Sequence, residues 1–218
     1  MISVIMRAYN NEQFLQRSIE SALSQTFADY ELLVVNDGST DKTKEILEAF
    51  RHQKIRILNQ KNQGMIAAGY AGLRAAEGGF VIFLDADDLF KAETLSELSQ
   101  AIHQDKNSAF AYGDYEEIDL RNNRKKIVSC RNVLNVLACG VLFKRSALRN
   151  VGFWDPSFIF PEHDLMLRIS KKYSGVHIVK PLYVYHRHAG SFTAHAEKIS
   201  QGLQQLAARY GPLEFKEY

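Results

Sequence analysis

The first half of the chain alternates short apolar runs with stripes of apolar residues at helical spacing, and this alternation restricts the fold most strongly. The runs are rich in Val, Ile, Leu and Phe and predict buried strands at residues 2–6, 30–35, 55–58 and 80–84. The stripes predict amphipathic helices that include residues 15–23, 43–50, 66–73 and 95–102. Strands and helices in this order, with short connections, favour a mainly parallel central sheet between two layers of helices.

The second half is less regular and predicts a small antiparallel subregion. Residues 110–120 and 126–129 form two expected strands around the turn 121–124, where Asn tolerates a positive φ. We expect a short helix at 164–172, a strand at 176–185 and a closing helix at 194–210 that ends at Gly211 and Pro212. With no linker or repeat, the 218 residues suit a single α/β domain over 1–218.

Composition restricts the class of protein. Hydrophobic residues make up 46% and charged residues 24% of the chain, which is typical of a soluble globular enzyme. The net charge of +2 gives no general attraction for nucleic acid, so no nucleic-acid partner is expected. No signal peptide or membrane span is recognisable. Cys130 and Cys139 lack the spacing of a zinc site, so we expect reduced thiols in the cytoplasm.

Ligands bind beyond the carboxyl ends of the strands in such sheets, which directs attention to residues 8–11, 36–40, 59–64 and 85–90. In the last of these loops Asp85, Asp87 and Asp88 directly follow an apolar strand, so their like charges need a cation. Mg²⁺ or Mn²⁺ fits, because such ions take carboxylate oxygens and leave positions open for phosphate. The alternative, to be weighed for Asp88 above all, is that one of the three caps the helix that begins near Lys91 and that the others are solvated.

Asp37 lies directly after the second strand and before Gly38, which permits a close backbone approach. A carboxylate at that position can accept an N–H group of a nucleobase such as uracil. The alternative is an ordinary Asx turn that leads into the next helix.

Two segments in this half resemble a known family. They are RAYNNEQFLQRSIESALSQTFADYELLVVNDGSTDKT and NQGMIAAGYAGLRAAEGGFVIFLDADD, and they resemble the nucleotide-binding half of the family 2 glycosyltransferases with the GT-A fold. The similarity runs from Ile2 to about Leu89 and continues more weakly to about Thr193. It implies a Rossmann-like, three-layer α/β/α fold, with a nucleotide-sugar-binding half at 1–90 and an acceptor-side half at 91–218.

The resemblance also implies residue roles. Tyr9 corresponds to the residue that lines the nucleobase pocket, Asp37 to the one that reads the base, and Asp85 and Asp87 to the DxD pair. In that pair Asp85 meets the ribose or the water shell of the metal, and Asp87 holds the Mn²⁺ or Mg²⁺ that bridges the diphosphate. The expected donor-binding residues are Ala8, Tyr9, Asn10, Asp37, Asn62, Gly64, Asp85, Ala86 and Asp87.

Inversion in one displacement needs a base that takes the proton of the acceptor hydroxyl. The segment GFWDPSFIFPEHDLMLRIS resembles the family's base-carrying stretch, but the family's Glu falls on Pro161 and its Asp on Glu162. Glu162 is the expected base and Asp164 its rival. Alternatively, both merely place negative charge in the first turn of a helix.

Three other positions bear on the comparison. Where the family commonly has Ala-Arg-Asn, this chain has Ala68, Gly69 and Tyr70, so the usual Arg is missing. Arg187 and His188, in YHRHAGSFT, resemble a basic segment near the family's active site and could approach the diphosphate. The alternative is an ordinary surface or core histidine. Trp154 could stack on a sugar or pack in the core.

The expected function is therefore that of an inverting glycosyltransferase that moves a sugar from a nucleotide-diphosphate sugar, with UDP favoured, to a glycan, lipid-linked or other hydroxyl acceptor in polysaccharide biosynthesis. One alternative is a non-catalytic nucleotide-sugar-binding module. A nucleotidyltransferase is the other, but it should carry a Gly-rich basic loop, which RAYNNEQ is not. Many family members work at the inner face of a membrane, which allows peripheral association, although the closing helix lacks a strong basic and aromatic face.

Overall fold

The structure, a computed structural model, describes residues 1–131, 139–191 and 196–211. It confirms the alternation of strands and helices in the first half. The elements there are β1 (Ile2–Ala8), α1 (Leu15–Leu23), β2 (Tyr30–Asp37), α2 (Thr43–Ala49), β3 (Ile55–Gln60), α3 (Met65–Ala75) and β4 (Phe80–Asp85).

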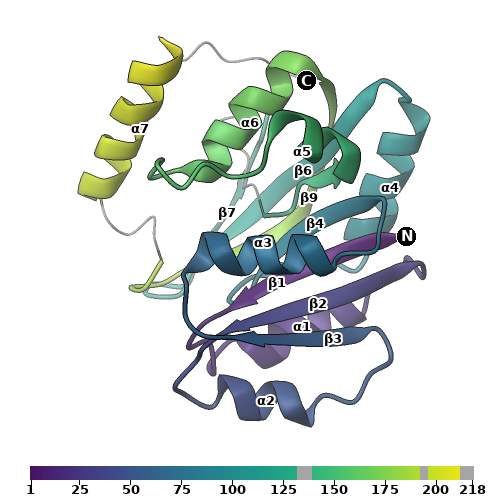
Figure 1. Ribbon diagram of the computed structural model, residues 1–218, viewed down its shortest axis with the longest axis vertical. Coiled ribbons are helices and arrows are strands. Elements are labelled where there is room, and N and C mark those ends of the chain that lie inside the picture. The colour runs from purple at the N-terminus through teal and green to yellow at the C-terminus, as the bar shows by residue number, and fades with distance from the viewer. Residues whose placement is uncertain (132–138, 192–195, 212–218) are drawn as a thin grey trace.

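These four strands pair in parallel, in the order β3-β2-β1-β4. Arg7 of β1 lies opposite Val35 of β2 and Asp85 of β4, so the carboxyl ends of the strands reach the same edge of the sheet. Every residue of β1 and β2 is buried, as expected for strands covered on both faces. Figure 1 shows α3 across one face of these strands and α1 on the other.

The second half adds further strands to the same sheet, together with further helices. They are β5 (Leu89–Phe90), α4 (Thr94–Gln104), β6 (Ser108–Asp119), β7 (Arg124–Val128), β8 (Leu142–Lys144), α5 (Arg145–Val151), α6 (Pro161–Lys172), β9 (Ser174–Arg187) and α7 (Ala196–Tyr210). The sequence did not predict β5, β8 or α5, because strands of two or three residues and a helix of seven carry little periodic signal.

The complete sheet follows the order β3-β2-β1-β4-β8-β6-β9-β5, with β7 paired to β6. The predicted antiparallel hairpin of β6 and β7 is confirmed, and Asn123 in its turn has a φ of 55°. β8 runs antiparallel to both β4 and β6, whereas β6 and β9 are parallel. The sheet in the second half of the chain is therefore mixed, and a single sheet joins both halves of the chain.

The closing helix is observed as α7, although the predicted start at residues 194–195 and the predicted stop at Pro212 lie outside the described residues. Gly211 adopts a φ of 79° and its N–H donates to the carbonyl of Ala207 at 2.9 Å, which ends the helix as expected. In the described part of the chain, no helix has the length and apolar character needed to cross a membrane. Cys130 and Cys139 are both free and buried.

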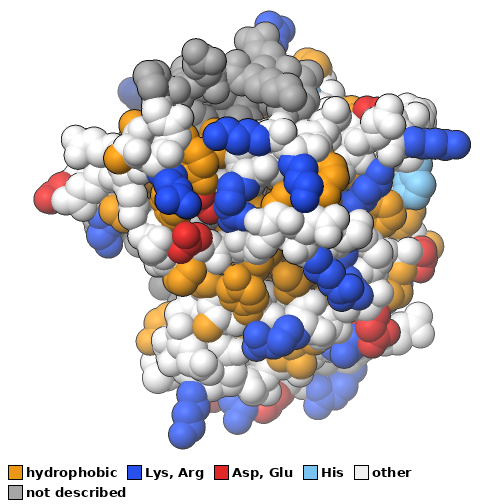
Figure 2. All heavy atoms as spheres, turned by 45° about the horizontal axis from the view of Figure 1, so that its top comes forward, with side chains coloured by type: hydrophobic (Ala, Val, Ile, Leu, Met, Phe, Trp, Pro, Cys, Tyr) orange, Lys and Arg blue, Asp and Glu red, His pale blue; other side chains and the backbone are white. Residues whose placement is uncertain are grey.

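Charged side chains are dispersed on the face that Figure 2 shows, where Lys and Arg lie apart with uncharged surface between them and hydrophobic side chains form a band across the middle. Dispersed charges are screened over roughly 8–10 Å at ordinary salt.

Candidate functional site

A cavity of about 550 Å³ lies at the carboxyl edge of β1, β2 and β4. This volume is within the usual range for small-molecule sites, about 300–1,000 Å³. Most of the residues that the sequence singled out line it, namely Ala8, Tyr9, Asp37, Asn62, Gly64, Asp85, Ala86, Asp87 and Glu162. Asn10 and Asp164 are not among the described residues that line it.

The side chain of Asn10 bonds to the backbone of a neighbouring loop rather than lining the cavity. It adopts a φ of 53°, and its Oδ1 accepts the N–H of Thr40 at 2.8 Å. Its own N–H donates to Oγ of Ser39 at 3.1 Å. Asn10 therefore ties the loop after β1 to the loop after β2.

Asp37 organises the loop that leads into α3. Its Oδ1 accepts from Nε2 of Gln60 at 2.7 Å and from the N–H of Gln63 at 2.9 Å, and its Oδ2 accepts from the N–H of Gly64 at 2.9 Å. Gly64 can take part because it adopts a φ of 86°, which is unfavourable for other residues. Only one acceptor position of Oδ2 is free of these bonds, so Asp37 holds the loop and still has one position for a ligand.

Asp85 has internal partners on both carboxylate oxygens. Nη2 of Arg7 lies 2.5 Å from its Oδ1, and Sγ of Cys139 donates to its Oδ2 at 3.0 Å. Burial alone would lower the pKa of Arg7, but the charges of Asp85, Cys139 and Glu162 outweigh burial and raise it. Arg7 is therefore a permanent cation beside the predicted DxD pair, and no motif in the sequence singles it out.

Asp87 has fewer side-chain partners than Asp85 among the described residues, although its side chain is less exposed than that of Asp85, which is 35% exposed. The side chain of Asp87 is 25% exposed, and Oδ2 lies 3.0 Å from Nε2 of His188, in the loop after β9. Burial and the neighbouring Asp85 raise the pKa of Asp87, so it gains by binding a cation. His188 thus contacts the acidic turn, which favours a role near the expected diphosphate position over that of an ordinary surface or core histidine.

Asp88 joins the acidic turn to β9. It is 2% exposed and accepts from the hydroxyl of Tyr183 and from the N–H of His186, both at 2.8 Å. Nδ1 of His186 is also 2.8 Å from the backbone carbonyl of Asp87. The expectation that Asp88 caps a helix or is solvated is therefore wrong, because β9 covers it.

Glu162 and Asp164 lie in the first turn of α6 but face different surroundings. Glu162 lines the cavity, is 18% exposed and has its Oε1 3.7 Å from Nη1 of Arg7. Burial raises its pKa, and the charge of Arg7 opposes that rise. Asp164 is 1% exposed, and its oxygens accept from Nε of Arg168 at 2.8 Å and from the hydroxyl of Tyr210. Asp164 thus joins α6 to α7.

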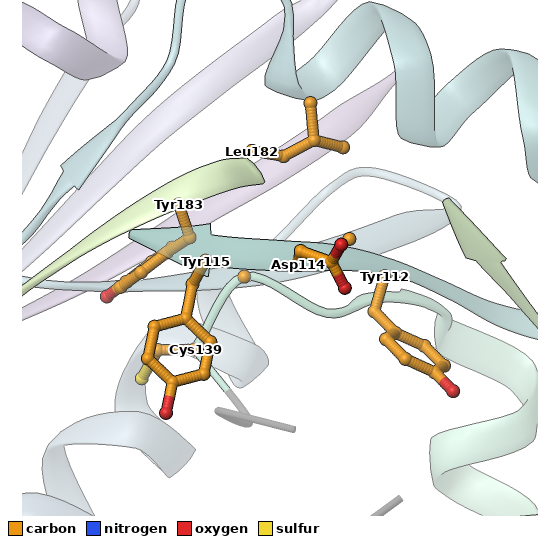
Figure 3. A pocket seen from close by; sticks show the side chains of 8 residues that line it. Tyr112, Asp114, Tyr115, Cys139, Leu182 and Tyr183 are labelled. Carbon is orange, nitrogen blue, oxygen red and sulfur yellow. The ribbon is translucent and has the colours of Figure 1, made fainter. Parts of the chain in front are cut away.

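A second and much smaller cavity, of about 10 Å³, lies behind Cys139. Figure 3 shows Cys139 beside Tyr115 and Tyr183, with Asp114 and Tyr112 further along β6. That volume holds about one water molecule. Cys139 lines both cavities and separates them, and burial and Asp85 raise its pKa well above the ordinary value, so its thiol acts here as a hydrogen-bond donor.

The sequence matches a family model, glycosyl transferase family 2, over residues 3–167. That match covers more than half of the chain. The chain belongs to glycosyl transferase family 2. In most of the curated relatives of this family that it matches, it spans only part of the length, for example 35% of an uncharacterized glycosyltransferase, EpsJ, from Bacillus subtilis at 34% identity over 54% of this chain.

Two further relatives and two solved structures extend the comparison. A UDP-Glc:alpha-D-GlcNAc-diphosphoundecaprenol beta-1,3-glucosyltransferase, WfgD, from Escherichia coli is 36% identical over 61% of this chain and 53% of its own length. An uncharacterized glycosyltransferase from Haemophilus influenzae is 29% identical over 88% of this chain and 78% of its own.

The solved structures share the fold. S. aureus TarS 1-349 in complex with UDP-GlcNAc has a TM-score of 0.79 at 22% identity and covers 98% of this chain and 68% of its own. A mannosyltransferase from Pyrobaculum calidifontis in complex with GDP-Man and Mn2+ has a TM-score of 0.75 at 18% identity, covering 98% and 65%. These similarities confirm the GT-A fold that the sequence predicted.

The family's missing Arg has a structural explanation. A Cβ atom on Gly69 would overlap the ring of Trp154, so no side chain fits at this position of α3. Trp154 is 2% exposed, which confirms core packing rather than sugar stacking. The centre of the Arg7 guanidinium lies 4.7 Å from the centroid of that ring.

Few of the described side chains in the site could bind a metal ion. Within the described ranges, no group of three or more His, Cys, Asp or Glu side chains is arranged to hold an ion. Asp87 and His188 nevertheless offer one oxygen and one nitrogen ligand, and both suit Mn²⁺. Such a pair fits an ion whose remaining ligands come from a diphosphate and water.

Proposed function

We propose that this family 2 protein is a metal-dependent, inverting glycosyltransferase, with residues 1–90 and 91–218 acting as one catalytic unit. The donor is a nucleotide-diphosphate sugar, for which UDP is favoured, and the acceptor is a hydroxyl group of a glycan or lipid-linked saccharide. One observation carries the proposal: Asp87, after β4, and Glu162, on α6, line the same cavity. A cation-binding carboxylate and a base thus face one reaction space.

Tyr9 and Asp37 form the nucleobase end of the site. Tyr9 is 48% exposed where it lines the cavity, so its ring is free to stack on a base. The remaining acceptor position on Oδ2 of Asp37 takes an N–H group of the base. Uracil offers such a group, which supports UDP.

Asp87 and His188 form the diphosphate end and would hold Mn²⁺ or Mg²⁺. A bound ion of this kind neutralises the negative charge that develops on the diphosphate as the glycosidic bond breaks. Both oxygens of Asp85 already accept hydrogen bonds, from Arg7 and Cys139. We therefore assign Asp85 to the ribose or to ordered water rather than to the ion itself. Support for a metal also comes from the Mn2+ named with the Pyrobaculum neighbour.

Glu162 acts as the base. Its carboxylate takes the proton of the acceptor hydroxyl while the acceptor oxygen forms a bond to the anomeric carbon. The bond from that carbon to the diphosphate oxygen breaks, and the electron pair leaves with the diphosphate. Because attack and departure occur on opposite faces, the configuration at the anomeric carbon inverts.

The nature of the acceptor follows from the relatives alone. The Escherichia coli relative is named for a diphosphoundecaprenol-linked GlcNAc acceptor. We therefore favour a lipid-linked saccharide, with the protein at the cytoplasmic face of a membrane.

The test is release of nucleoside diphosphate from a panel of UDP- and GDP-sugars with Mn²⁺, with and without saccharide acceptors. We expect release from at least one donor, and Glu162→Gln should slow it about 10²–10⁴-fold while UDP binding is unchanged. The matched control is Glu20→Gln, at an exposed position. Nucleotide binding with no release from any donor would instead indicate a non-catalytic binding module.

A further inference from the structure

Arg7 is the one cation that the described part of the chain buries in the floor of the cavity. It is 7% exposed, it lines the cavity, and its guanidinium lies over the ring of Trp154. Its neighbours come from both halves of the chain, with Asp85 after β4 and Glu162 on α6. Arg7 is therefore the physical link between the donor carboxylates and the base.

The two ends of the guanidinium are used differently. Nη2 is fully engaged, because it donates to Oδ1 of Asp85 and to Sγ of Cys139 at 3.3 Å. Nε and Nη1 are buried and have no hydrogen-bond partner among the described residues. A buried donor without a partner costs about 1–3 kcal/mol, and more when it is charged. The structure thus holds a strong donor whose acceptor is not yet in place.

Glu162 is the acceptor within reach. Its Oε1 lies 3.7 Å from Nη1 of Arg7, about 0.9 Å beyond the usual length of a charge-assisted hydrogen bond. Asp85 is already paired with the other end of the guanidinium, through Nη2, and its second oxygen accepts from Cys139. A small movement of α6 or a change of rotamer at Glu162 would complete the bond.

We propose that Arg7 is the positioning residue for Glu162: when donor and acceptor fill the cavity, Nη1 of Arg7 donates to Oε1 of Glu162 and aims Oε2 at the acceptor hydroxyl. This inference rests on the proposed function. Arg7 touches neither reacting atom. It fixes the base relative to Asp85, and so relative to the donor, so that the proton leaves the acceptor oxygen as the bond to the anomeric carbon forms.

The test compares Arg7→Met and Arg7→Lys with the native protein in UDP binding and in steady-state turnover. Arg7→Met removes the charge at similar length, and Arg7→Lys keeps the charge but replaces the planar fork, whose two Nη atoms face Asp85 and Glu162 separately, by one ammonium nitrogen. We expect kcat to fall about 10²-fold in Arg7→Met and less in Arg7→Lys, with a smaller change in KM for the donor. Arg56→Met is the matched control, because Arg56 also pairs with two carboxylates but is 43% exposed.

A double-mutant comparison separates positioning from a purely structural role. If Arg7 acts through Glu162, Arg7→Met should cause little further loss of kcat in the Glu162→Gln background. An equal loss in both backgrounds, or a loss confined to UDP affinity, would overturn the inference. Should Arg7→Met not fold, as judged by circular dichroism, Arg7→Lys carries the same comparison.

The pH profile supplies an independent readout. The charged or titratable groups that face Glu162 are Arg7, Asp85 and Cys139, and among them only Arg7 favours the ionised base. The acid limb of kcat/KM should therefore move up by roughly one pH unit in Arg7→Met. If both Arg7 variants keep the native kcat and the acid limb of kcat/KM does not move, the positioning role of Arg7 is contradicted, whereas the proposed function is not. Absence of turnover in the native protein would instead contradict the proposed function, and the inference with it.

Discussion

Nε2 of His188 lies 3.0 Å from Oδ2 of Asp87, although 101 residues separate them in the chain. The imidazole is held in place by Phe14, whose ring stacks on it with centroids 5.0 Å apart. The contact joins the loop after β9 to the loop after β4. It places an imidazole nitrogen beside the carboxylate that we propose as the metal ligand.

His188→Ala should weaken the effect of Mn²⁺ on nucleotide binding. The loss of a ligand or of its orienting partner typically costs about 10–100-fold in metal affinity. We expect UDP binding without metal to stay the same, whereas the gain on adding Mn²⁺ falls by about that factor. Calorimetric titration measures both quantities, and His52→Ala, at an exposed position before β3, is the control. A full Mn²⁺ effect in His188→Ala would exclude His188 from the metal site.

Asp164→Asn should reduce stability and leave chemistry intact. The bonds from Arg168 and Tyr210 to the buried carboxylate weaken, and the free energy of unfolding in urea should fall by about 1–3 kcal/mol. Turnover per folded molecule should stay within about threefold of the native value, unlike that of Glu162→Gln. If Asp164→Asn abolishes turnover and Glu162→Gln does not, the two roles are reversed.

Activity should decline on acidification at a higher pH than an ordinary glutamate would give. Burial raises the pKa of Glu162 and Arg7 opposes the rise, and only the ionised carboxylate can take a proton. At saturating metal, kcat/KM should therefore fall as the pH drops through a midpoint above about 4.3, the ordinary value for Glu. A midpoint at or below that value would show that burial does not govern the base.

Gly69→Ala should destabilise the fold, because its Cβ overlaps the ring of Trp154. Overpacking of this kind typically costs about 1–3 kcal/mol in the free energy of unfolding. Gly79→Ala is the matched control, since no atom lies within 4 Å of a Cβ at that exposed position. Equal stability of the two variants would show that Trp154 can move and that the missing Arg is not excluded by packing.

The first half of the fold could be predicted because its signals are local. Continuous apolar runs mark buried parallel strands, and the carboxyl ends of such strands meet at one edge. These two rules predict that Asp37, Asp85 and Asp87 lie close together, and all three line one cavity. They fail for Asn10, whose side chain turns to Thr40, because the direction of a loop side chain depends on contacts 30 residues away.

The second half of the fold could not be predicted to the same extent. Glu162 and Asp164 are two positions apart on a helix, so they point about 200° apart, and sequence alone does not tell which faces the cavity. The role of Arg7 depends on Cys139 and Glu162, which are distant in sequence. The short strands β5 and β8 have no period that can be recognised, yet β8 joins the two halves of the sheet.

The most direct measurement is calorimetric titration of UDP with and without Mn²⁺ into the native protein and Asp87→Ala, with Asp29→Ala as an exposed control. We predict that Mn²⁺ tightens UDP binding in the native protein and in Asp29→Ala, and that Asp87→Ala loses this metal effect. Failure of the native protein to bind UDP, or a UDP affinity that Mn²⁺ does not change, would contradict a metal-dependent nucleotide-sugar site at Asp87.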